Sequence, residues 1–233
     1  MTARGFTGEG RDRRGFLKGA AATLLAAGSA VLLSGTARAA QPRTGRTAPP
    51  SLPLPPLGTD IACSMYAANV PLKLNVLGAL TLDFKGGINM TVRSSGPDGV
   101  VFEVEGFRVE ADTSPSTPDS GTLIAMTMAN ATQTPLSVLQ PSPGGEELEM
   151  LIHLPLTLEV IDKANAETLS MLSTDPTKHA TLRATDVKQF PPVNQLYTLQ
   201  EPVTFYEQGG SEAQESPVLG TLYAFDVITN GAA

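Results

Sequence analysis

The sequence is poor in the residue types that most disulfide frameworks and metal centres require. Its 233 residues include one cysteine, two histidines and no tryptophan, and aromatic residues make up 5% of the chain. A single cysteine cannot form an internal disulfide, and these few His and Cys residues cannot build a zinc site. We therefore expect no bound cofactor or metal, and we expect Cys63 to be a small buried apolar side chain.

Familiar catalytic motifs are missing as well. Beyond the first 39 residues there is no G-x-S-x-G, H-E-x-x-H, phosphate-binding glycine loop or C-x-x-C. The stretch EADTSPSTPDSGT (110–122) is rich in acids and hydroxyls, which are calcium ligands. The same composition is typical of a solvated connection between two strands, and we favour that interpretation.

The first 39 residues have the pattern of a cleaved export signal. Arg13-Arg14-Gly15-Phe16-Leu17-Lys18 precedes an apolar run of about 14 residues, Ala20–Leu33, which is too short to span a membrane. Ala37-Arg38-Ala39 is a small-residue cleavage site, so we expect the mature chain to begin at Ala40. The paired arginines resemble the twin-arginine signal, which implies a bacterial protein that the twin-arginine export machinery secretes in folded form.

The charge balance limits the partners of the mature protein. The chain carries a formal net charge of −7, and the export signal contains six basic but only two acidic residues, so its removal leaves a more acidic protein. An acidic protein is repelled by phosphate backbones and anionic lipids, so we expect no nucleic-acid partner. Cys63 lies about 30 residues beyond the apolar run, too far for a lipid-modified cysteine, and we expect no stable membrane anchor.

A proline-rich segment follows the export signal. Residues 41–58 contain six prolines and no periodic apolar pattern, so we expect residues 40–58 to form an extended tether. The folded domain is then residues 59–233.

Within this domain the apolar residues recur mostly at every second position. Leu80, Leu82, Phe84, Ile88, Met90 and Val92 alternate with polar residues, a turn follows at 94–99, and the alternation resumes over 100–111. This pattern predicts a hairpin over 80–111, and the change of phase at Gly106 predicts a β-bulge.

Similar runs predict further strands, and only one segment favours a helix. The additional strands are expected at 65–77, 122–131, 148–160, 180–190, 197–206 and 218–229. Asp162 is a helix-capping residue and predicts a short helix over Asp162–Leu172. The fold class is therefore all-β, a single mostly antiparallel sandwich or barrel. In a barrel, the apolar face either forms a core or lines a cavity large enough for a lipid.

The candidate catalytic residues follow from the two histidines. His153 lies in the predicted strand on the face opposite Met150 and Ile152, whereas His179 lies between a proline turn and a strand, where catalytic residues are commonly found. Asp175 precedes His179 by four residues, and Ser120 in PDSGT lies beside a glycine in a predicted turn. We therefore take Ser120, Asp175 and His179 as a candidate nucleophile, orienting acid and base.

Several segments resemble the small secreted sterol-ester hydrolases (cholesterol esterases) of actinomycetes. These are CSMYAANVPL, NMTVRSSGPDGVVFEVEGFRVEA, and LSTDPTKHATLRATDVKQFPP followed by LYTLQEPVTFY. The resemblance implies an extracellular hydrolase that acts on fatty esters of sterols or similar bulky lipids. It does not carry over any catalytic residue.

Two functions are therefore expected from the sequence. One is a secreted lipid-ester hydrolase whose partner is an apolar lipid or sterol ester. The alternative is a secreted, non-catalytic β-rich protein that binds lipids or belongs to the cell envelope, which fits the missing catalytic motifs.

Overall fold

The computed structural model describes residues 54–116, 120–129, 135–142 and 147–231, all within the unit Thr47–Ala233. The predicted export signal (1–39) and residues 40–53 of the predicted tether lie outside these residues. So do residues 117–119 of the acidic loop and the end of the strand expected at 122–131.

The described chain is built almost entirely from strands. The only helical element in it is the 3-10 turn η1 (Glu212–Gln214). The strands are β1 (Asp60–Leu74), β2 (Gly78–Gly96), β3 (Gly99–Asp112), β4 (Thr122–Met128), β5 (Ser137–Pro141), β6 (Leu148–Leu154), β7 (Leu156–Asp162), β8 (Glu167–Thr174), β9 (Ala180–Ala184), β10 (Val193–Leu199), β11 (Val203–Glu207), β12 (Gly220–Leu222) and β13 (Val227–Gly231).

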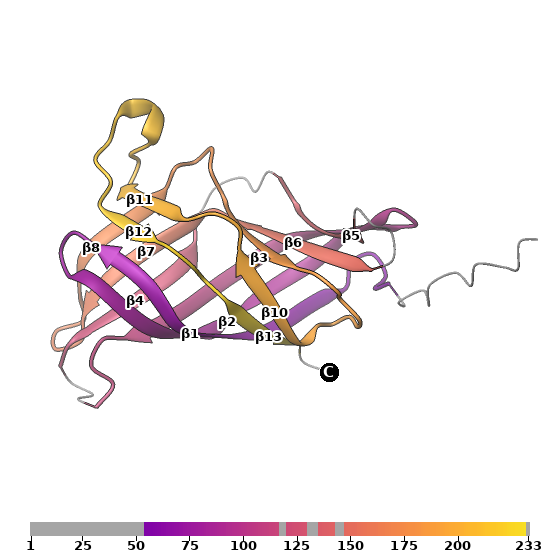
Figure 1. Cartoon of the computed structure of the whole chain (residues 1–233), viewed down its shortest axis with the longest axis horizontal. Helices are drawn as coiled ribbons and strands as arrows, with labels where there is room; N and C mark the ends of the chain where they lie inside the picture. The colour runs from indigo at the N-terminus through magenta and orange to yellow at the C-terminus, as the bar shows by residue number, and fades with distance from the viewer. Residues whose placement is uncertain (1–53, 117–119, 130–134, 143–146, 232–233) are drawn as a thin grey trace, which may run out of the picture. The chain divides into compact units, whose positions relative to one another are not determined.

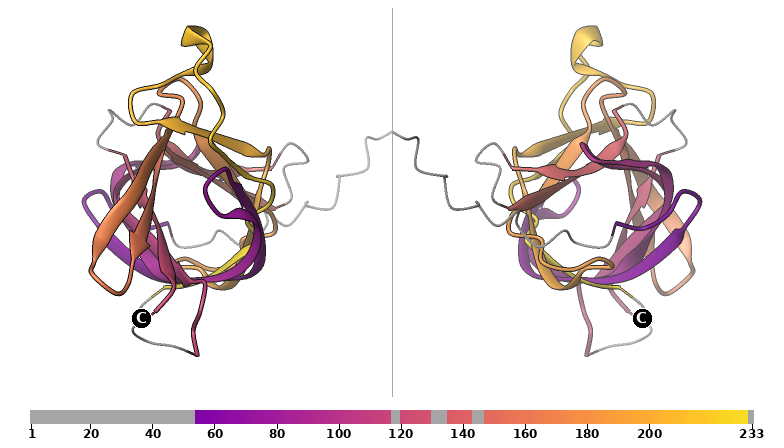
Figure 2. Two further views of the ribbon diagram at one scale, coloured as in Figure 1. Left: turned by 90° about the vertical axis from the view of Figure 1, so that its left-hand side faces the viewer. Right: turned by 90° about the vertical axis from the view of Figure 1, so that its right-hand side faces the viewer.

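The strands form one antiparallel sheet that closes on itself as a barrel (Figures 1 and 2). Each of the long strands β1, β2 and β3 fills one strand position around the barrel. Each of five further positions is shared by two shorter strands, namely β4/β5, β6/β7, β8/β9, β10/β11 and β12/β13. Both β12 and β13 pair with β1, and both β4 and β5 pair with β3. The thirteen strands therefore occupy eight positions in simple up-and-down order, and the barrel follows sequence order throughout.

Four of the shared positions are interrupted at neighbouring places, and we call this line of interruptions the seam. It consists of Pro155 and residues 175–179, 200–202 and 223–226. Single backbone hydrogen bonds connect the interruptions to their neighbours, such as Ala129 N–H to Pro155 O and Gln200 N–H to Thr181 O. Three interruptions contain a proline, which has no N–H to donate to a ladder, so the sequence itself ends the pairing there.

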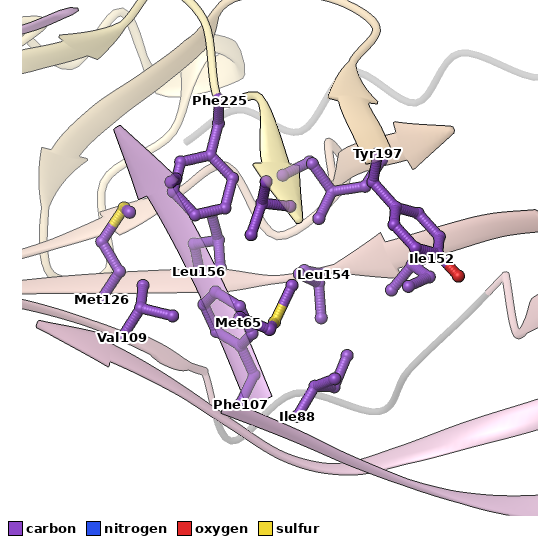
Figure 3. Close-up of a cluster of buried hydrophobic side chains, with 14 of the residues drawn as sticks. Met65, Ile88, Phe107, Val109, Met126, Ile152, Leu154, Leu156, Tyr197 and Phe225 are labelled. Carbon is purple, nitrogen blue, oxygen red and sulfur yellow. The ribbon is translucent and has the colours of Figure 1, made fainter. Parts of the chain in front are cut away.

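The inside of the barrel is a packed apolar core. Alternate residues of each strand point inward, as in β1, where every second residue from Ile61 to Ala67 is buried. Figure 3 shows the side chains of Met65 (β1), Ile88 (β2), Phe107 (β3), Ile152 (β6) and Tyr197 (β10) within one interior cluster. The largest of the fully buried side chains are Tyr197, Phe84, Phe102, Phe205, Leu72 and Leu74. The apolar face was expected either to form a core or to line a cavity large enough for a lipid, and it forms a core.

Several sequence predictions are confirmed. The domain is all-β, and the hairpin over 80–111 corresponds to β2 and β3. The β2–β3 register shifts where Asn89 faces Gly106 and Met90 faces Val104, which is the predicted bulge. Cys63 is buried in the core, and burial raises the pKa of its thiol to about 11.

The helix predicted over Asp162–Leu172 is wrong. The chain there completes β7, turns, and begins β8 at Glu167. Asp162 does accept a hydrogen bond from the N–H of Ala164, but the bond belongs to a turn, in which Asn165 bonds Glu167 in the same way. Pairing of β8 with β7 and β11 outweighs the local helix signal.

The other strand predictions had the right location but missed the interruptions. The strand expected over 148–160 is two strands separated by Pro155, and the run expected over 197–206 is divided at 200–202. The short strand β5 was not predicted. Across the described residues, no helix has the length and apolar character that crossing a membrane requires.

Candidate functional site

A groove with a volume of about 760 Å³ lies at the seam, where β8/β9 and β10/β11 are interrupted. The loop 208–219, which carries η1 and projects from the barrel in Figure 1, forms one of its borders. We call it the seam groove. Its lining residues are Thr174, Asp175, Lys178, His179, Thr181, Gln200, Glu201, Pro202, Val203, Thr204, Tyr206, Glu212, Glu215, Ser216 and Val218.

Asp175 joins two borders of the groove. One carboxylate oxygen accepts hydrogen bonds from the backbone N–H and the hydroxyl of Thr177, and the other accepts the N–H of Glu212 at 2.9 Å. The bonds from Thr177 and Glu212 hold the pKa of this carboxyl below its usual range. The Lys178 ammonium is paired with the carboxylate of Glu212, which lies in the 208–219 loop. Asp175 therefore keeps the 208–219 loop against the end of β8.

His179 lies just before β9 and presents a half-buried imidazole to the groove. Its Nε2 atom is buried and has no hydrogen-bond partner among the described residues. Burial lowers the pKa of His179 below its usual value, so the ring is neutral at neutral pH. A buried ring nitrogen without a partner costs about 1–3 kcal/mol, and a bound molecule that supplies a partner would recover this energy.

The second histidine is a neighbour of the first. His153 lies on the outer face of β6, where its Nδ1 is 3.1 Å from the hydroxyl of Thr181. Burial, and then the proximity of His179, lower the pKa of His153. Of the two histidines only His179 lines the seam groove, and His153 lies on the strand face opposite Met150 and Ile152, as predicted.

The structure does not bring the three candidate catalytic residues together. Ser120 precedes β4, whose first residue Thr122 pairs with Asp162, which in turn pairs with Glu167 at the start of β8. Asp175 and His179 follow the other end of β8. β8 has eight residues and therefore seven steps of about 3.3 Å, so its length separates Ser120 from Asp175 by roughly 23 Å.

Asp175 does not take its expected place either, since its carboxylate accepts hydrogen bonds from Thr177 and Glu212 and not from His179. The triad of Ser120, Asp175 and His179 is therefore not assembled, although Asp175 and His179 line the same groove.

Other groove residues were not found from the sequence. The Tyr206 hydroxyl accepts a hydrogen bond from Thr204, and the Ser216 hydroxyl accepts one from the N–H of Ser211, so both can still donate to a ligand. Thr181, Tyr206 and Ser216 come from three separate segments that only barrel closure brings together. No local sequence pattern marks them.

The acidic loop at 110–122 was weighed as a calcium site. Asp112 accepts hydrogen bonds from the Lys163 ammonium at 2.6 Å and from the N–H of Ser114, which lower its pKa. In the part of the chain that the structure describes, no cluster of three or more His, Cys, Asp or Glu residues is placed to hold a metal ion.

Comparison with known proteins adds information on the fold alone. No family model matches the sequence, and no curated protein matches it. A solved structure with a similar fold is that of DynF from the dynemicin biosynthesis pathway of Micromonospora chersina, with a TM-score of 0.53. The two share 14% sequence identity, and the match covers 82% of this chain and 92% of DynF.

Proposed function

We propose that this protein binds a small organic ligand in the seam groove, and that the ligand has both an apolar part and hydrogen-bonding groups. The observation that carries the proposal is the imidazole of His179, whose buried Nε2 has no hydrogen-bond partner among the described residues while the ring borders a groove of about 760 Å³. This volume is within the range of roughly 300–1,000 Å³ that is usual for ligand sites.

The lining supports such a ligand on chemical grounds. Pro202, Val203 and Val218 offer apolar surface, while Tyr206 and Ser216 offer hydroxyl donors. Ligand sites typically combine an apolar wall with a few polar groups that fix orientation. A lipid or sterol ester has both features, so the ligand class expected from the sequence is compatible with the groove. Because the barrel interior is packed, the proposal places this ligand in the wall of the barrel.

Ester hydrolysis is a second candidate, and the neutral state of His179 favours it. A neutral imidazole can take a proton from water, and the water oxygen then attacks the ester carbonyl. The bond to the alcohol oxygen breaks, the imidazolium returns the proton to this oxygen, and the alcohol and the acid are released. This mechanism needs no serine nucleophile, and it therefore does not require Ser120. Asp175 would act on His179 only indirectly, by holding the groove in shape.

A comparison of the two histidines tests both candidates. Cholesteryl oleate and a chromogenic fatty ester are added to the purified protein, and binding and turnover are measured for wild type, His179→Ala and His153→Ala. We expect His179→Ala to weaken binding at least tenfold and His153→Ala to change it less than twofold.

Turnover separates the candidates. Hydrolysis that falls roughly 10²–10⁴-fold in His179→Ala supports the esterase, whereas binding without turnover supports the binding protein. In proton NMR spectra the ring signals of the two histidines should also separate, with that of His179 shifting on ligand addition. Equal effects of the two substitutions, or no binding of either ester, would contradict the proposed site.

A further inference from the structure

The lining of the seam groove is acidic. It carries one ammonium and four carboxylates, those of Lys178 and of Asp175, Glu201, Glu212 and Glu215. Four negative charges against one positive charge give a formal charge of −3 while the imidazole in the groove is neutral. Lys178 is paired with Glu212, and within the described chain the other three carboxylates form no ion pair. The groove therefore has an excess of negative charge that a bound cation offsets.

The neighbouring basic residue does not offset this charge. Arg183 of β9 does not line the groove, and its guanidinium is held 2.7 Å from the Glu149 carboxylate of β6. Asp175 stays ionised at neutral pH, because the hydrogen bonds from Thr177 and Glu212 hold its pKa below the usual range. A concave site lined by one sign of charge raises the local concentration of ions of the other sign. The groove therefore favours cations over anions.

The buried Nε2 atom of His179 restricts the ligand further. A neutral imidazole has one N–H donor and one acceptor nitrogen, so Nε2 either accepts or donates a hydrogen bond according to the tautomer. A carboxylate ligand would accept a hydrogen bond from an Nε2–H group but would lie among carboxylates of the same charge. A protonated amine donates an N–H group to Nε2 and also offsets the charge of the lining. An ammonium with at least one N–H therefore matches both features of the groove.

We propose that the ligand of the seam groove is a cationic amphiphile whose polar end is a protonated primary or secondary amine. The amine donates a hydrogen bond to Nε2 of His179. Glu201 and Glu215, which line the groove and are exposed to solvent, supply the opposite charge. Pro202 and Val218 contact the apolar part. The inference rests on the ligand site proposed above, and it makes Glu201 and Glu215 the residues that determine charge specificity.

Four ligands with the same alkyl chain test the charge preference. They are octylamine, octyltrimethylammonium, octan-1-ol and octanoate, and isothermal titration calorimetry of the full chain at neutral pH and low salt measures their affinities. Octylamine should bind at least tenfold more tightly than octan-1-ol, and octanoate should bind at least tenfold more weakly than octan-1-ol. Added sodium chloride should reduce both differences, because salt screens exposed charges.

Removal of two carboxylates tests the residues that determine specificity. The double variant Glu201→Gln/Glu215→Gln should bind octylamine at least fivefold more weakly than wild type, while its affinity for octan-1-ol changes less than twofold. The matched control is Glu147→Gln/Glu167→Gln, which removes the same charge at two exposed carboxylates outside the groove, before β6 and at the start of β8. The control should bind octylamine within twofold of wild type, and an equal loss in both double variants would overturn the assignment.

The ammonium that has no N–H tests the role of Nε2. Wild type should bind octylamine at least fivefold more tightly than octyltrimethylammonium, which keeps the charge but cannot donate a hydrogen bond to His179. In His179→Ala the two affinities should lie within twofold of one another, whereas His153→Ala should keep the preference of wild type. A preference that survives in His179→Ala would contradict the hydrogen bond to Nε2.

The results distinguish failure of this inference from failure of the ligand site on which it rests. If octan-1-ol binds as tightly as octylamine, and His179→Ala weakens both, the groove is a ligand site but the preference for an amine is wrong. If none of the four compounds binds, the ligand site itself is contradicted and the inference falls with it.

Discussion

The barrel has two kinds of wall, one with continuous strands and one with interrupted strands, and the proposed ligand site lies in the interrupted wall. Strands β1, β2 and β3 run the full length of the barrel without a complete break, and they accommodate irregularities as bulges. The strands on the other side are interrupted at the seam, three of them at prolines. The continuous wall has a full ladder of backbone hydrogen bonds, whereas at the seam the ladder is reduced to isolated bonds.

This difference explains where the groove lies. A complete ladder leaves no room for a ligand between strands, and its side chains either pack in the core or face water. At the seam, residues 175–179 and 200–202 leave the regular pleat, so side chains such as His179 and backbone turns border an open volume. We therefore expect substitutions in the continuous wall to lower stability, and substitutions at the seam to alter binding at less cost to stability.

The largest effect is expected in the core behind the continuous wall. Phe102 of β3 is fully buried and stacks on Phe190 with ring centroids 5.2 Å apart. Phe102→Ala should lower the free energy of unfolding by about 3–5 kcal/mol, since it removes buried apolar area and leaves a cavity. Urea unfolding followed by circular dichroism measures the change. Leu169→Ala, at an exposed position, is the control, and a loss of similar size there would contradict the assignment.

A smaller effect is expected at a close approach of two continuous strands. An added Cβ at Gly86 of β2 would lie 2.0 Å from the carbonyl oxygen of Arg108, whereas at Gly96 it would meet no atom within 4 Å. Gly86→Ala should therefore lower the free energy of unfolding by about 1–3 kcal/mol, and Gly96→Ala should change it by less than about 0.5 kcal/mol. Thermal unfolding of the two variants decides the point, and equal melting temperatures would rule out the close packing of β2 on β3.

The smallest effect on stability, with a large effect on binding, is expected at the seam. Asp175→Ala removes the acceptor for the N–H groups of Thr177 and Glu212, which releases the 208–219 loop. The free energy of unfolding should fall by about 1–2 kcal/mol, while ligand affinity at the groove should fall at least tenfold. Urea unfolding and ligand titration of the same sample compare the two, and a variant that binds ligand normally would contradict the role of Asp175.

The same residue gives a pH dependence. The pKa of Asp175 is lowered in the folded protein, so its contribution is present above the unfolded pKa of about 3.9 and is lost as pH falls through the folded pKa. The stability difference between wild type and Asp175→Ala should therefore be constant near neutral pH and narrow below about pH 4.

The sequence predicted the continuous wall better than the seam, for physical reasons. Alternation of apolar residues in β2 and β3, and the phase change at Gly106, are local signals with one structural solution. The seam arises because prolines interrupt neighbouring strands at adjacent points along the barrel. Only the register of the closed barrel places these interruptions side by side. The helix expected from Asp162 failed for the same reason, since strand pairing decided the conformation.

The candidate site shows the same limit. His179 and Asp175 were found because they flank a turn beside a strand, and both line the groove. Ser120 was chosen for its local turn, but the length of β8 separates it from them. Tyr206 and Ser216 line the groove only because distant segments of the chain come together in the fold, and no local sequence pattern predicts such contacts.

The pairing of β1 with β12 and β13 has a consequence for biosynthesis. Cys63, near the start of the domain, pairs with Gly231, almost at its end. The barrel therefore cannot close until β13 has been synthesised. Until then β1 has one unpaired edge, open to the strands of other nascent chains. Closure joins residues of very high sequence separation, so we expect it to be a slow step of folding.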